Sequence, residues 1–550
     1  LLVELGDDQY VAELTGHTIT PENFLGIEIN PRAAAIAQLV LWIGYLQWHF
    51  RVNGADRTPP EPILRDVKTI ENRDALIEWD KKLAELDENG DPVSRRDGET
   101  MKVHPVTGKK VPDETARVEV FRYIKPRAAK WPKADFIVGN PPFIGNKRMR
   151  KRLGENYAKA LRAAWPKVPK SVDLVMYWWD RCAELTQSGQ LRAFGLVSTN
   201  SIKQVTNRAV IEKWLKTRPA LKLSFAIPDH PWMDDETTAQ VRISMTAAAK
   251  TGRMGFLETI QSERKVKGQP NVVELVSQLG QIHSNLTIGA NITDCGPLKS
   301  NDAVSFMGVI PSGTGFRISA EELKECGHDL SDLPSVVRTY LVGNELTDNK
   351  APGFIVDYFG LNEAQAREAS PPLFQFVLNR VKDGRDARSG GTADSQQYAA
   401  EWWLFAKPRP GMRAALKGQS RYIATTETSK HRWFTFLSPT VLPDQKIRGV
   451  AIDDAFYLGV LSSRIHVVWS DAAGGRQGVG NDPVYNNTTC FEPFPFPADV
   501  SDVVKGKIRI EAEAFDALRK RVLESHEDLT LTKLYNVLEA LREGRALTDA

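Results

Sequence analysis

Cysteine is scarce in this chain of 550 residues. The four cysteines, Cys182, Cys295, Cys326 and Cys490, are widely spaced and form neither a CxxC pair nor a His–Cys pattern typical of zinc sites. We therefore expect no metal site, no disulfide framework and a reducing, cytoplasmic environment. No run of about 18 apolar residues occurs, so we expect no membrane-spanning helix. Residues 1–10 lack the positive charges of a signal peptide.

The most informative stretch is the sequence ADFIVGNPPF at residues 134–143. Residues 136–138 predict a short, buried, parallel strand, and ligands bind beyond the carboxyl ends of such strands in open α/β sheets. The four residues that follow this strand are Asn140, Pro141, Pro142 and Phe143. The Asn140 side-chain oxygen and the Pro141 carbonyl can accept hydrogen bonds from an NH2 group, and the prolines fix the backbone. The alternative is that Asn-Pro-Pro only ends a strand.

These acceptors suit chemistry on an exocyclic amine such as adenine N6. Such an amine is a poor nucleophile while its lone pair is delocalised into the ring, and hydrogen-bond acceptors can draw it out of conjugation. A base inside a duplex is unreachable, so it must be flipped into a pocket, where Phe143 can stack on it. Transfer of a methyl group to the amine then depends mainly on positioning and electrostatics.

The tetrapeptide resembles the catalytic signature (D/N/S)PP(Y/F/W) of the S-adenosylmethionine-dependent N6-adenine DNA methyltransferases. The chain is most similar to the large bacterial MmeI-like enzymes (type IIL restriction-modification) and to related phage-defence methyltransferases, over most of its length. The resemblance implies an α/β fold, with a Rossmann-like class I methyltransferase sheet, a mixed α/β target recognition domain and a C-terminal helical segment. It also implies S-adenosyl-L-methionine as cofactor, double-stranded DNA as partner, and site-specific methylation of adenine N6 by base flipping.

A candidate ribose-binding residue lies upstream. Residues 24–30 (FLGIEIN) predict a short strand with an acidic residue at its end, and an apolar helix is expected over 33–48. An acidic side chain in this position can accept hydrogen bonds from both ribose hydroxyls, although a surface glutamate in a turn would show the same pattern. The family resemblance assigns the ribose contact to Glu28.

Two further segments resemble cofactor motifs of the family. In residues 70–76 (IENRDAL) the resemblance assigns Asp74 to the adenine amino group of the cofactor and the Ala75 backbone N–H to the same adenine; an ordinary helix N-terminus is the alternative. Residues 171–179 predict a helix with Asp173 as its N-cap. The resemblance places this helix beside the cofactor and the flipped base, and Asp173 in the cofactor site. Downstream, residues 193–197 predict a buried strand, and residues 198–201 (STNS) match the sixth motif.

The segment after the tetrapeptide is strongly basic. Residues 144–170 contain nine Lys or Arg residues and a single acid, Glu155, although the whole chain carries a net charge of only +3. Phosphate contacts supply most nonspecific nucleic-acid affinity, so we expect a DNA-facing loop here; a solvated helix face is the alternative. The DNA contacts are assigned to Lys147, Arg148, Arg150 and Lys151.

Breaks in the pattern indicate two or three domains. We expect a catalytic domain over 1–251, with an insertion at about 80–133 that has poor order around 87–111. Its sheet should resume at 223–227 and close at 241–249, bracketing a loop at 229–232. A target recognition domain is expected over 285–497 and a C-terminal helical segment over 498–550, whose charged amphipathic helices pack back on the recognition domain.

Candidate DNA contacts in the recognition domain lie in mixed aromatic and basic segments. Residues 402–409 and 430–433 suit phosphate and base contacts, although a core tryptophan with a charged neighbour is the alternative. Residues 462–466 (SSRIH), 474–476 (GGR) and 485–487 (YNN) resemble the end of the family's recognition domain. A glycine-flanked arginine can approach DNA closely, so Arg476 is assigned a phosphate or base contact.

The family's first cofactor motif, a glycine-rich turn of the DPACGSGNFL type, has no equivalent in the sequence. We therefore expect that the chain is an amino-terminally truncated fragment, with residues 1–10 as the helix after that turn, and that a nuclease or another defence subunit can be fused upstream. Methylation of RNA or of protein glutamine by the same fold is an alternative function. A catalytically silent DNA-binding subunit is another.

Overall fold

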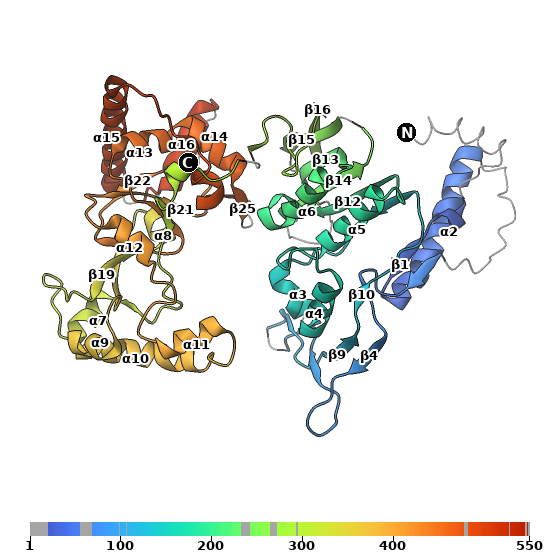
Figure 1. Cartoon of the computed structure of the whole chain (residues 1–550), viewed down its shortest axis with the longest axis horizontal. Helices are drawn as coiled ribbons and strands as arrows, with labels where there is room; N and C mark the ends of the chain where they lie inside the picture. The colour runs from blue at the N-terminus through green and yellow to red at the C-terminus, as the bar shows by residue number, and fades with distance from the viewer. Residues whose placement is uncertain are drawn as a thin grey trace. The chain divides into compact units, whose positions relative to one another are not determined.

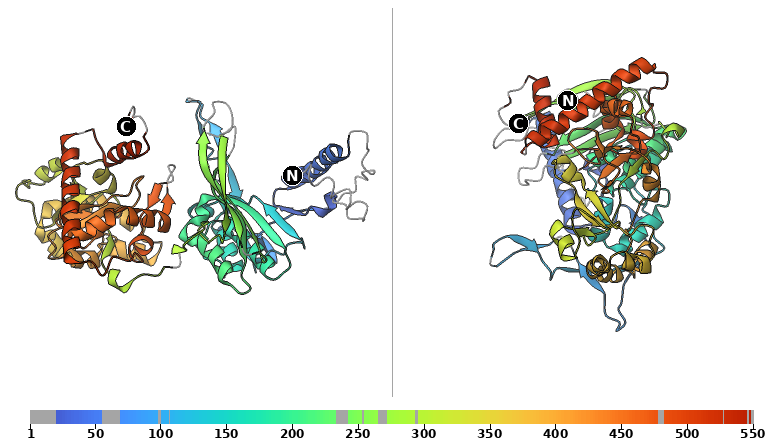
Figure 2. Two further views of the ribbon diagram at one scale, coloured as in Figure 1. Left: turned by 90° about the horizontal axis from the view of Figure 1, so that it is seen from above. Right: turned by 90° about the vertical axis from the view of Figure 1, so that its left-hand side faces the viewer.

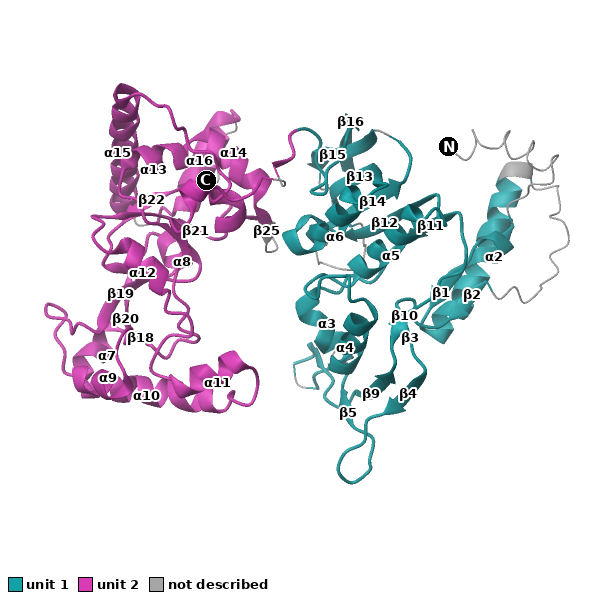
Figure 3. Ribbon diagram, viewed as in Figure 1, with its two compact units in different colours: residues 1–289 teal, residues 290–550 magenta. Residues whose placement is uncertain are grey.

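The computed structural model describes the chain in two compact units, residues 1–289 and 290–550 (Figure 3). In the parts of the chain that the structure describes, no helix is long and apolar enough to cross a membrane. The described residues are 20–54, 69–97, 100–105, 107–232, 242–252, 254–264, 272–292, 295–477, 482–526, 528–544 and 547.

Unit 1 is built around a six-stranded sheet with the strand order β11-β12-β14-β13-β15-β16 (Figure 1). β11 is parallel to β12, and β14 is antiparallel to both of its neighbours, β12 and β13. The carboxyl ends of β11, β12 and β13 therefore lie at the same edge of the sheet. The strands are β11 (Phe136–Gly139), β12 (Ala193–Thr199), β13 (Lys222–Pro231), β14 (Arg242–Ala249), β15 (Gly255–Arg264) and β16 (Val272–Gly280).

Helices α5 (Val175–Gln187) and α6 (Val205–Lys216) pack against this sheet, and their buried side chains form a hydrophobic core with it. Trp179 is fully buried, packs edge-on against Phe194 of β12 and donates a hydrogen bond of 3.3 Å to Thr246 Oγ1 of β14. The buried Asp180 carboxylate accepts hydrogen bonds from the Trp214 indole (2.6 Å) and from Lys213 Nζ (2.9 Å), which joins α5 to α6. These contacts fix the helices that pack against the sheet.

The amino-terminal elements form a second, smaller parallel pair. β1 (Gly26–Glu28) pairs with β2 (Ile70–Asn72), and α2 (Pro31–Asn53) connects them along the chain. α2 begins with a proline at its first position, and the Asn30 side chain caps it by accepting hydrogen bonds from Arg32 N and Ala33 N. The helix ends before Gly54, whose φ is 86°. The expected helix over 33–48 is confirmed and is longer at both ends.

The insertion forms a two-stranded arm rather than a poorly ordered segment. We call residues 81–124 the β-arm; it projects from the body of unit 1 as the blue hairpin in Figure 2. The expectation of poor order around 87–111 is wrong for the residues that the structure describes, because the chain pairs with itself along the arm. The pairs are β4 (Lys81–Ala84) with β9 (Phe121–Ile124), β5 (Ser94–Arg96) with β8 (Arg117–Glu119), and β6 (Met101–Val103) with β7 (Lys110–Pro112). At its root, β3 (Ile77–Glu78) pairs with β10 (Arg127–Ala128).

Three expectations about the sheet need correction. The sheet does not close at residue 249, because β15 pairs with β13 and β16 pairs with β15, so unit 1 continues beyond residue 251 to residue 289. Residues 229–231, expected in a loop, belong to β13, which contains a register shift before His230. β11 is parallel, as expected, but only partly buried: Ile137 packs on the core, whereas Phe136 and Val138 are 60% and 88% exposed. On that face, the Arg192 guanidinium lies 6.0 Å from the centre of the Phe136 ring, and both Phe136 and Val138 remain largely accessible to solvent.

Unit 2, residues 290–550, contains two four-stranded sheets. One sheet has the order β17 (Ser305–Met307), β24 (Ile447–Val450), β21 (Tyr422–Thr426) and β22 (Thr435–Leu437). The other has the order β18 (Arg317–Ile318), β20 (Gly353–Val356), β19 (Val337–Leu341) and β23 (Val441–Pro443). Its helices include α7 (Ala320–Glu325), α8 (Gly343–Thr347), α9 (Glu363–Ala369), α10 (Pro371–Asp386), α11 (Ala393–Ala400), α12 (Pro410–Leu416), α13 (Ala455–Ser462) and α14 (Arg464–Ala473).

The carboxyl-terminal helices α15 (Asp502–Ser525) and α16 (Leu531–Arg542) belong to the same unit. The buried Asp516 of α15 accepts a hydrogen bond of 2.9 Å from Thr435 Oγ1 of β22. Arg509 of α15 forms an ion pair of 2.7 Å with Asp454, which caps α13. The expected packing of this helical segment on the recognition region is confirmed by these contacts.

Candidate active site

The tetrapeptide Asn140 to Phe143 leaves β11 at the edge where β12 and β13 also end. Asn140 is exposed, and its side chain has no hydrogen-bond partner among the residues that the structure describes. Pro141 is buried, and Phe143 is half-buried. The backbone beyond the tetrapeptide is fixed, because Leu174 N donates a hydrogen bond of 2.9 Å to Ile144 O. The Asn140 amide oxygen is therefore free to accept a hydrogen bond from a substrate amine.

Asp173 joins the segment after the tetrapeptide to the segment after β12. Its Oδ1 accepts a hydrogen bond of 2.9 Å from Asn146 N, the first residue of α3 (Asn146–Leu153). Its Oδ2 accepts hydrogen bonds of 2.8 Å from Ser201 Oγ and from Asn207 Nδ2. Ser201 lies in the short helix η2 (Asn200–Lys203), within the segment that resembles the sixth motif.

The expected role of Asp173 as the N-cap of the helix that follows it is wrong. α5 begins at Val175 after Leu174, without a side-chain cap. The Asp173 carboxylate instead caps α3, because it accepts a hydrogen bond from Asn146 N, the first N–H group of α3. Asn207, missed in the sequence, is 2% exposed and also accepts from Asp173 N through its Oδ1 (2.9 Å). An asparagine in an amphipathic helix gives no local signal of this role.

A charged network lies at the same edge of the sheet, on β13, β14 and β15. Arg242 donates from Nε to Asp229 Oδ1 at 2.8 Å and from Nη1 to Glu263 Oε2 at 3.0 Å. Asn200 Nδ2 contacts the same Asp229 oxygen at 3.4 Å. His230 contacts the Pro231 carbonyl through Nδ1 at 2.8 Å. The sequence did not indicate this network, since its members come from three strands.

The two candidate cofactor acids lie after adjacent strands. Glu28 ends β1, and one of its carboxylate oxygens accepts a hydrogen bond of 2.8 Å from Asn30 N. Asn72, at the end of β2, donates from its side chain to Glu28 O at 2.8 Å, and Arg73 N donates to the same carbonyl at 3.1 Å. The parallel pairing of β1 and β2 thus brings Glu28 near the turn that contains Asp74.

Asp74 occupies the turn between β2 and β3 rather than a helix N-terminus. Its side chain is 7% exposed and accepts hydrogen bonds from Leu76 N (2.7 Å), Ile77 N (3.0 Å) and the Tyr157 hydroxyl (2.8 Å). Burial, and then the Asp74 charge, raise the pKa of Tyr157 far above its usual range, so this hydroxyl remains a donor. The adjacent Ala75 carbonyl accepts from the Trp131 indole at 2.6 Å.

The basic segment after the tetrapeptide forms two helices, not the expected loop. These are α3 and α4 (Glu155–Ala164). Glu155 neutralises part of the charge through ion pairs with Arg150 (3.4 Å) and Lys159 (3.8 Å). The exposed cations of α3 include Lys147, Arg148, Arg150 and Lys151. Of these four, only Arg150 has a carboxylate partner among the described residues. A helix surface of this charge suits phosphate contact.

The aromatic and basic segments of unit 2 are mostly core. Trp402 and Trp433 are 3% and 1% exposed, so the interpretation as DNA-contacting side chains is wrong for them. Arg432 is also buried and donates to Thr425 Oγ1 (3.0 Å) and Pro483 O (3.2 Å). Arg476 lies in β25 (Gly475–Gln477), opposite Pro483 of β26 (Asp482–Val484), but its side chain is outside what the structure describes. Its DNA contact stays a prediction.

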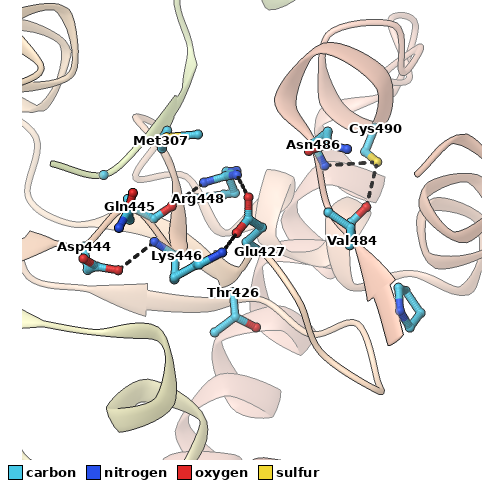
Figure 4. Close-up of polar contacts among 12 residues, drawn as sticks. Met307, Thr426, Glu427, Asp444, Gln445, Lys446, Arg448, Val484, Asn486 and Cys490 are labelled. Carbon is cyan, nitrogen blue, oxygen red and sulfur yellow. Dashed lines mark hydrogen bonds and ion pairs between the residues drawn. The ribbon is translucent and has the colours of Figure 1, made fainter. Parts of the chain in front are cut away.

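Unit 2 also contains a partly buried ionic group that the sequence did not reveal. Figure 4 shows Glu427 held between Lys446 and Arg448. The Arg448 side chain is 3% exposed and also donates to Gln445 O at 2.7 Å. Lys446 N donates to Asp444 Oδ1 at 2.8 Å. These contacts join the end of β21 to the turn before β24 and fix the two segments relative to each other within unit 2.

Acid is expected to destabilise unit 2 through His466. This side chain is fully buried, contacts the Tyr485 hydroxyl at 2.9 Å through Nε2, and packs on Phe494. Burial, and secondarily the charge of Arg432, lower the pKa of His466 to about 3. In the unfolded state His466 binds a proton with a pKa of about 6.5, whereas in the folded state it stays neutral down to about pH 3. The free energy of unfolding therefore falls as the pH is lowered from 6.5 toward 3, and the loss is roughly 2 kcal/mol at pH 5.

Urea unfolding of unit 2 at a series of pH values between 7 and 4.5 measures this loss. In His466→Gln, which cannot be protonated, this part of the pH dependence should vanish, although the variant is less stable at neutral pH. An identical slope in the wild-type protein and in the variant would assign the acid sensitivity to other groups.

Comparison with known proteins agrees with this arrangement. The family model of the MmeI DNA-methyltransferase domain matches residues 5–256, and that of the MmeI target recognition domain matches residues 297–498. The curated protein "DNA methyltransferase A" of Bacillus subtilis (strain 168) is 22% identical over 545 residues, which are 97% of this chain and 52% of that protein.

The fold matches the solved structure of the type IIL restriction-modification enzyme MmeI in complex with DNA. The TM-score is 0.65 at 20% identity, over 94% of this chain and 61% of that one. The chain spans about half the length of the curated Bacillus subtilis relative, 52% of it. This chain contains a methyltransferase domain followed by a target recognition domain, and it belongs to the MmeI-like DNA methyltransferase family.

Proposed function

We propose that this protein transfers a methyl group from S-adenosylmethionine to adenine N6 at a specific sequence in double-stranded DNA. The observation that carries the proposal is the tetrapeptide Asn140 to Phe143 at the catalytic edge of the sheet, with a free amide at Asn140 and the cationic helix α3 directly after it. We further propose that the reaction serves restriction-modification or phage defence in the cytoplasm. A nuclease fused to the whole protein is part of this proposal.

The chemistry follows from the groups present. The target adenine leaves the duplex and stacks on Phe143, while Asn140 Oδ1 and Pro141 O accept the two hydrogens of its amine. The amine lone pair is then directed at the methyl carbon, a C–N bond forms as the C–S bond breaks, and the amine proton leaves to solvent. Asp173 keeps the loop that carries these acceptors in place through α3, which serves positioning rather than proton transfer.

The residues at the ends of β1 and β2 fit the nucleoside part of the cofactor. One Glu28 oxygen is held by Asn30 N, which leaves the other to accept from the ribose hydroxyls. The Ala75 N–H faces no protein acceptor among the described residues, and Asp74 holds the turn that presents it. The buried position of Asp74 suits this structural role better than a direct contact through both carboxylate oxygens. S-adenosylmethionine, when bound, supplies an electrophilic methyl group.

A transfer assay tests the proposed function. The purified protein with its natural amino terminus is incubated with S-adenosylmethionine labelled in the methyl group and with unmodified duplex DNA of mixed sequence. Nucleoside mass spectrometry should then find the label in N6-methyladenine at one recurrent sequence. Label in cytosine, in RNA or in a glutamine-containing peptide in place of adenine would contradict the proposal. DNA binding without any transfer would favour a catalytically silent DNA-binding subunit.

A further inference from the structure

The β-arm has one face that is anchored on unit 1. Tyr123 of β9 packs edge-on against Tyr157 of α4, with ring centroids 5.8 Å apart. Arg95 of β5 donates from its guanidinium to the carbonyls of Lys151 (3.1 Å) and Arg152 (2.9 Å), the last turn of α3. A cation at the carboxyl end of a helix satisfies its free carbonyls and complements its dipole. The arm is thereby fixed to the helix that follows the catalytic tetrapeptide.

The opposite face of the β5–β8 pair presents two arginines to solvent. Successive side chains in a strand point to opposite faces, so Arg96 points away from the face of Arg95. Arg96 lies directly opposite Arg117 in the antiparallel register, and both are exposed. Arg117 is held by Ser94 Oγ at 2.8 Å, but neither arginine has a carboxylate partner among the described residues. Like charges directly opposite each other destabilise an antiparallel pair, so a bound anion would stabilise this one.

The tip of the arm adds further unpaired cations. Residues 101–112 contain three lysines and no acid. Lys102 is paired with Glu114 and lies 3.8 Å from Asp113, so its charge is neutralised within the arm. Lys109 and Lys110 have no such partner among the described residues. The turn between β6 and β7 is closed by a hydrogen bond of 2.8 Å from His104 N to Lys109 O.

We propose that the exposed face and tip of the β-arm contact the phosphates of double-stranded DNA beside the flipped base. This inference rests on the proposed function. Duplex DNA is the polyanion that this protein is proposed to bind, and its major groove admits a two-stranded β-ribbon. The arm and the cationic surface of α3 are joined through Arg95, so both can contact the same duplex. The contacts position the duplex and read no sequence.

A salt series of DNA-binding titrations tests this inference. The probe is a fluorescent, unmodified duplex that contains the sequence at which the transfer assay finds N6-methyladenine. The variant is R96Q/K109Q/K110Q. Each lost phosphate contact lowers the steepness of log Kd against log salt by about 1, so the slope should fall by about 3 if all three residues contact phosphate. The loss should be similar for duplexes of unrelated sequence, because phosphates carry no sequence information.

Two control variants are provided by the same arm. Lys102→Gln removes a lysine that is already paired, and the salt slope should stay unchanged. Glu119→Gln removes an acid next to the Arg96–Arg117 pair, on the same face, and DNA binding should strengthen. Thermal unfolding of each variant tests whether the arm substitutions leave the fold intact.

The failure of this inference differs from the failure of the proposed function. Wild-type protein that neither binds duplex DNA nor transfers methyl groups would overturn the proposed function. Wild-type protein that binds and methylates DNA, with the same affinity and salt slope in R96Q/K109Q/K110Q, would overturn the role of the arm alone. Loss of binding to an acidic protein in the triple variant, with DNA binding unchanged, would also overturn it.

Discussion

Asn140→Ala is expected to lower the rate of methyl transfer by about 10²- to 10³-fold, the loss typical of removing one positioned hydrogen-bond group from a reacting centre. The variant loses the acceptor that draws the amine lone pair toward the methyl carbon. Asn140 is exposed and its side chain supports no other residue in the described structure, so the free energy of unfolding should change by less than about 0.5 kcal/mol. Binding of duplex DNA should persist, because α3 and the recognition region are unchanged.

Single-turnover transfer from labelled S-adenosylmethionine measures this effect, with DNA affinity and thermal unfolding measured on the same samples. Asn140→Asp restores an acceptor oxygen at the same position and should keep much more activity than the alanine variant. Asn156→Ala, which removes an asparagine bonded to Glu85 outside the tetrapeptide, serves as the matched control. An unchanged transfer rate in Asn140→Ala would show that the tetrapeptide is not the catalytic group.

The largest loss of stability is expected from Arg385→Ala in unit 2, at about 3–5 kcal/mol. The Arg385 side chain of α10 is 7% exposed and faces the Phe316 ring at 5.3 Å. Burial lowers the pKa of this guanidinium to about 10. The alanine variant leaves buried acceptors without a donor, and each costs about 1–3 kcal/mol before water enters. The five carbonyls that accept from Arg385 are those of Pro311, Tyr398, Glu401, Trp402 and Leu404.

Urea unfolding followed by tryptophan fluorescence measures this loss, in the transition that belongs to unit 2. Arg380→Ala, on the same helix, removes an exposed arginine paired with Glu322 and should cost less than about 1 kcal/mol. Arg385→Lys keeps the charge but not the planar set of donors, and should fall between the two. A loss below about 1 kcal/mol in Arg385→Ala would show that water replaces the arginine without strain.

Sequence motifs predicted the parts of the site that depend on short stretches of chain. The strand before Asn140 and the helix after Glu28 were both predictable, because strand and helix patterns, caps and prolines act over a few residues. The family resemblance added the order of the two domains, which the family models confirm. Burial was less predictable: Val138 reads as a core residue but is 88% exposed, since burial depends on which elements cover the strand.

The contacts between these parts were decided by the tertiary structure. Asp173 caps α3 rather than α5, Asn207 binds Asp173, and Arg385 collects carbonyls from two distant segments. Each of these roles depends on residues far apart in the chain, and a side chain carries no local mark of the partner that folding brings to it. The same holds for the β-arm, whose register follows from pairing across a long hairpin.

By itself, the sequence determined the tetrapeptide Asn140 to Phe143, the acidic residue at the end of β1 and the concentration of positive charge after the tetrapeptide, because these are properties of residue type and spacing. Only the tertiary structure decided that this charge lies on two helices, that the sheet continues through β16, and that Arg95 ties the arm to α3. The physical reason is that packing and long-range hydrogen bonds select one arrangement among many that satisfy the same local preferences.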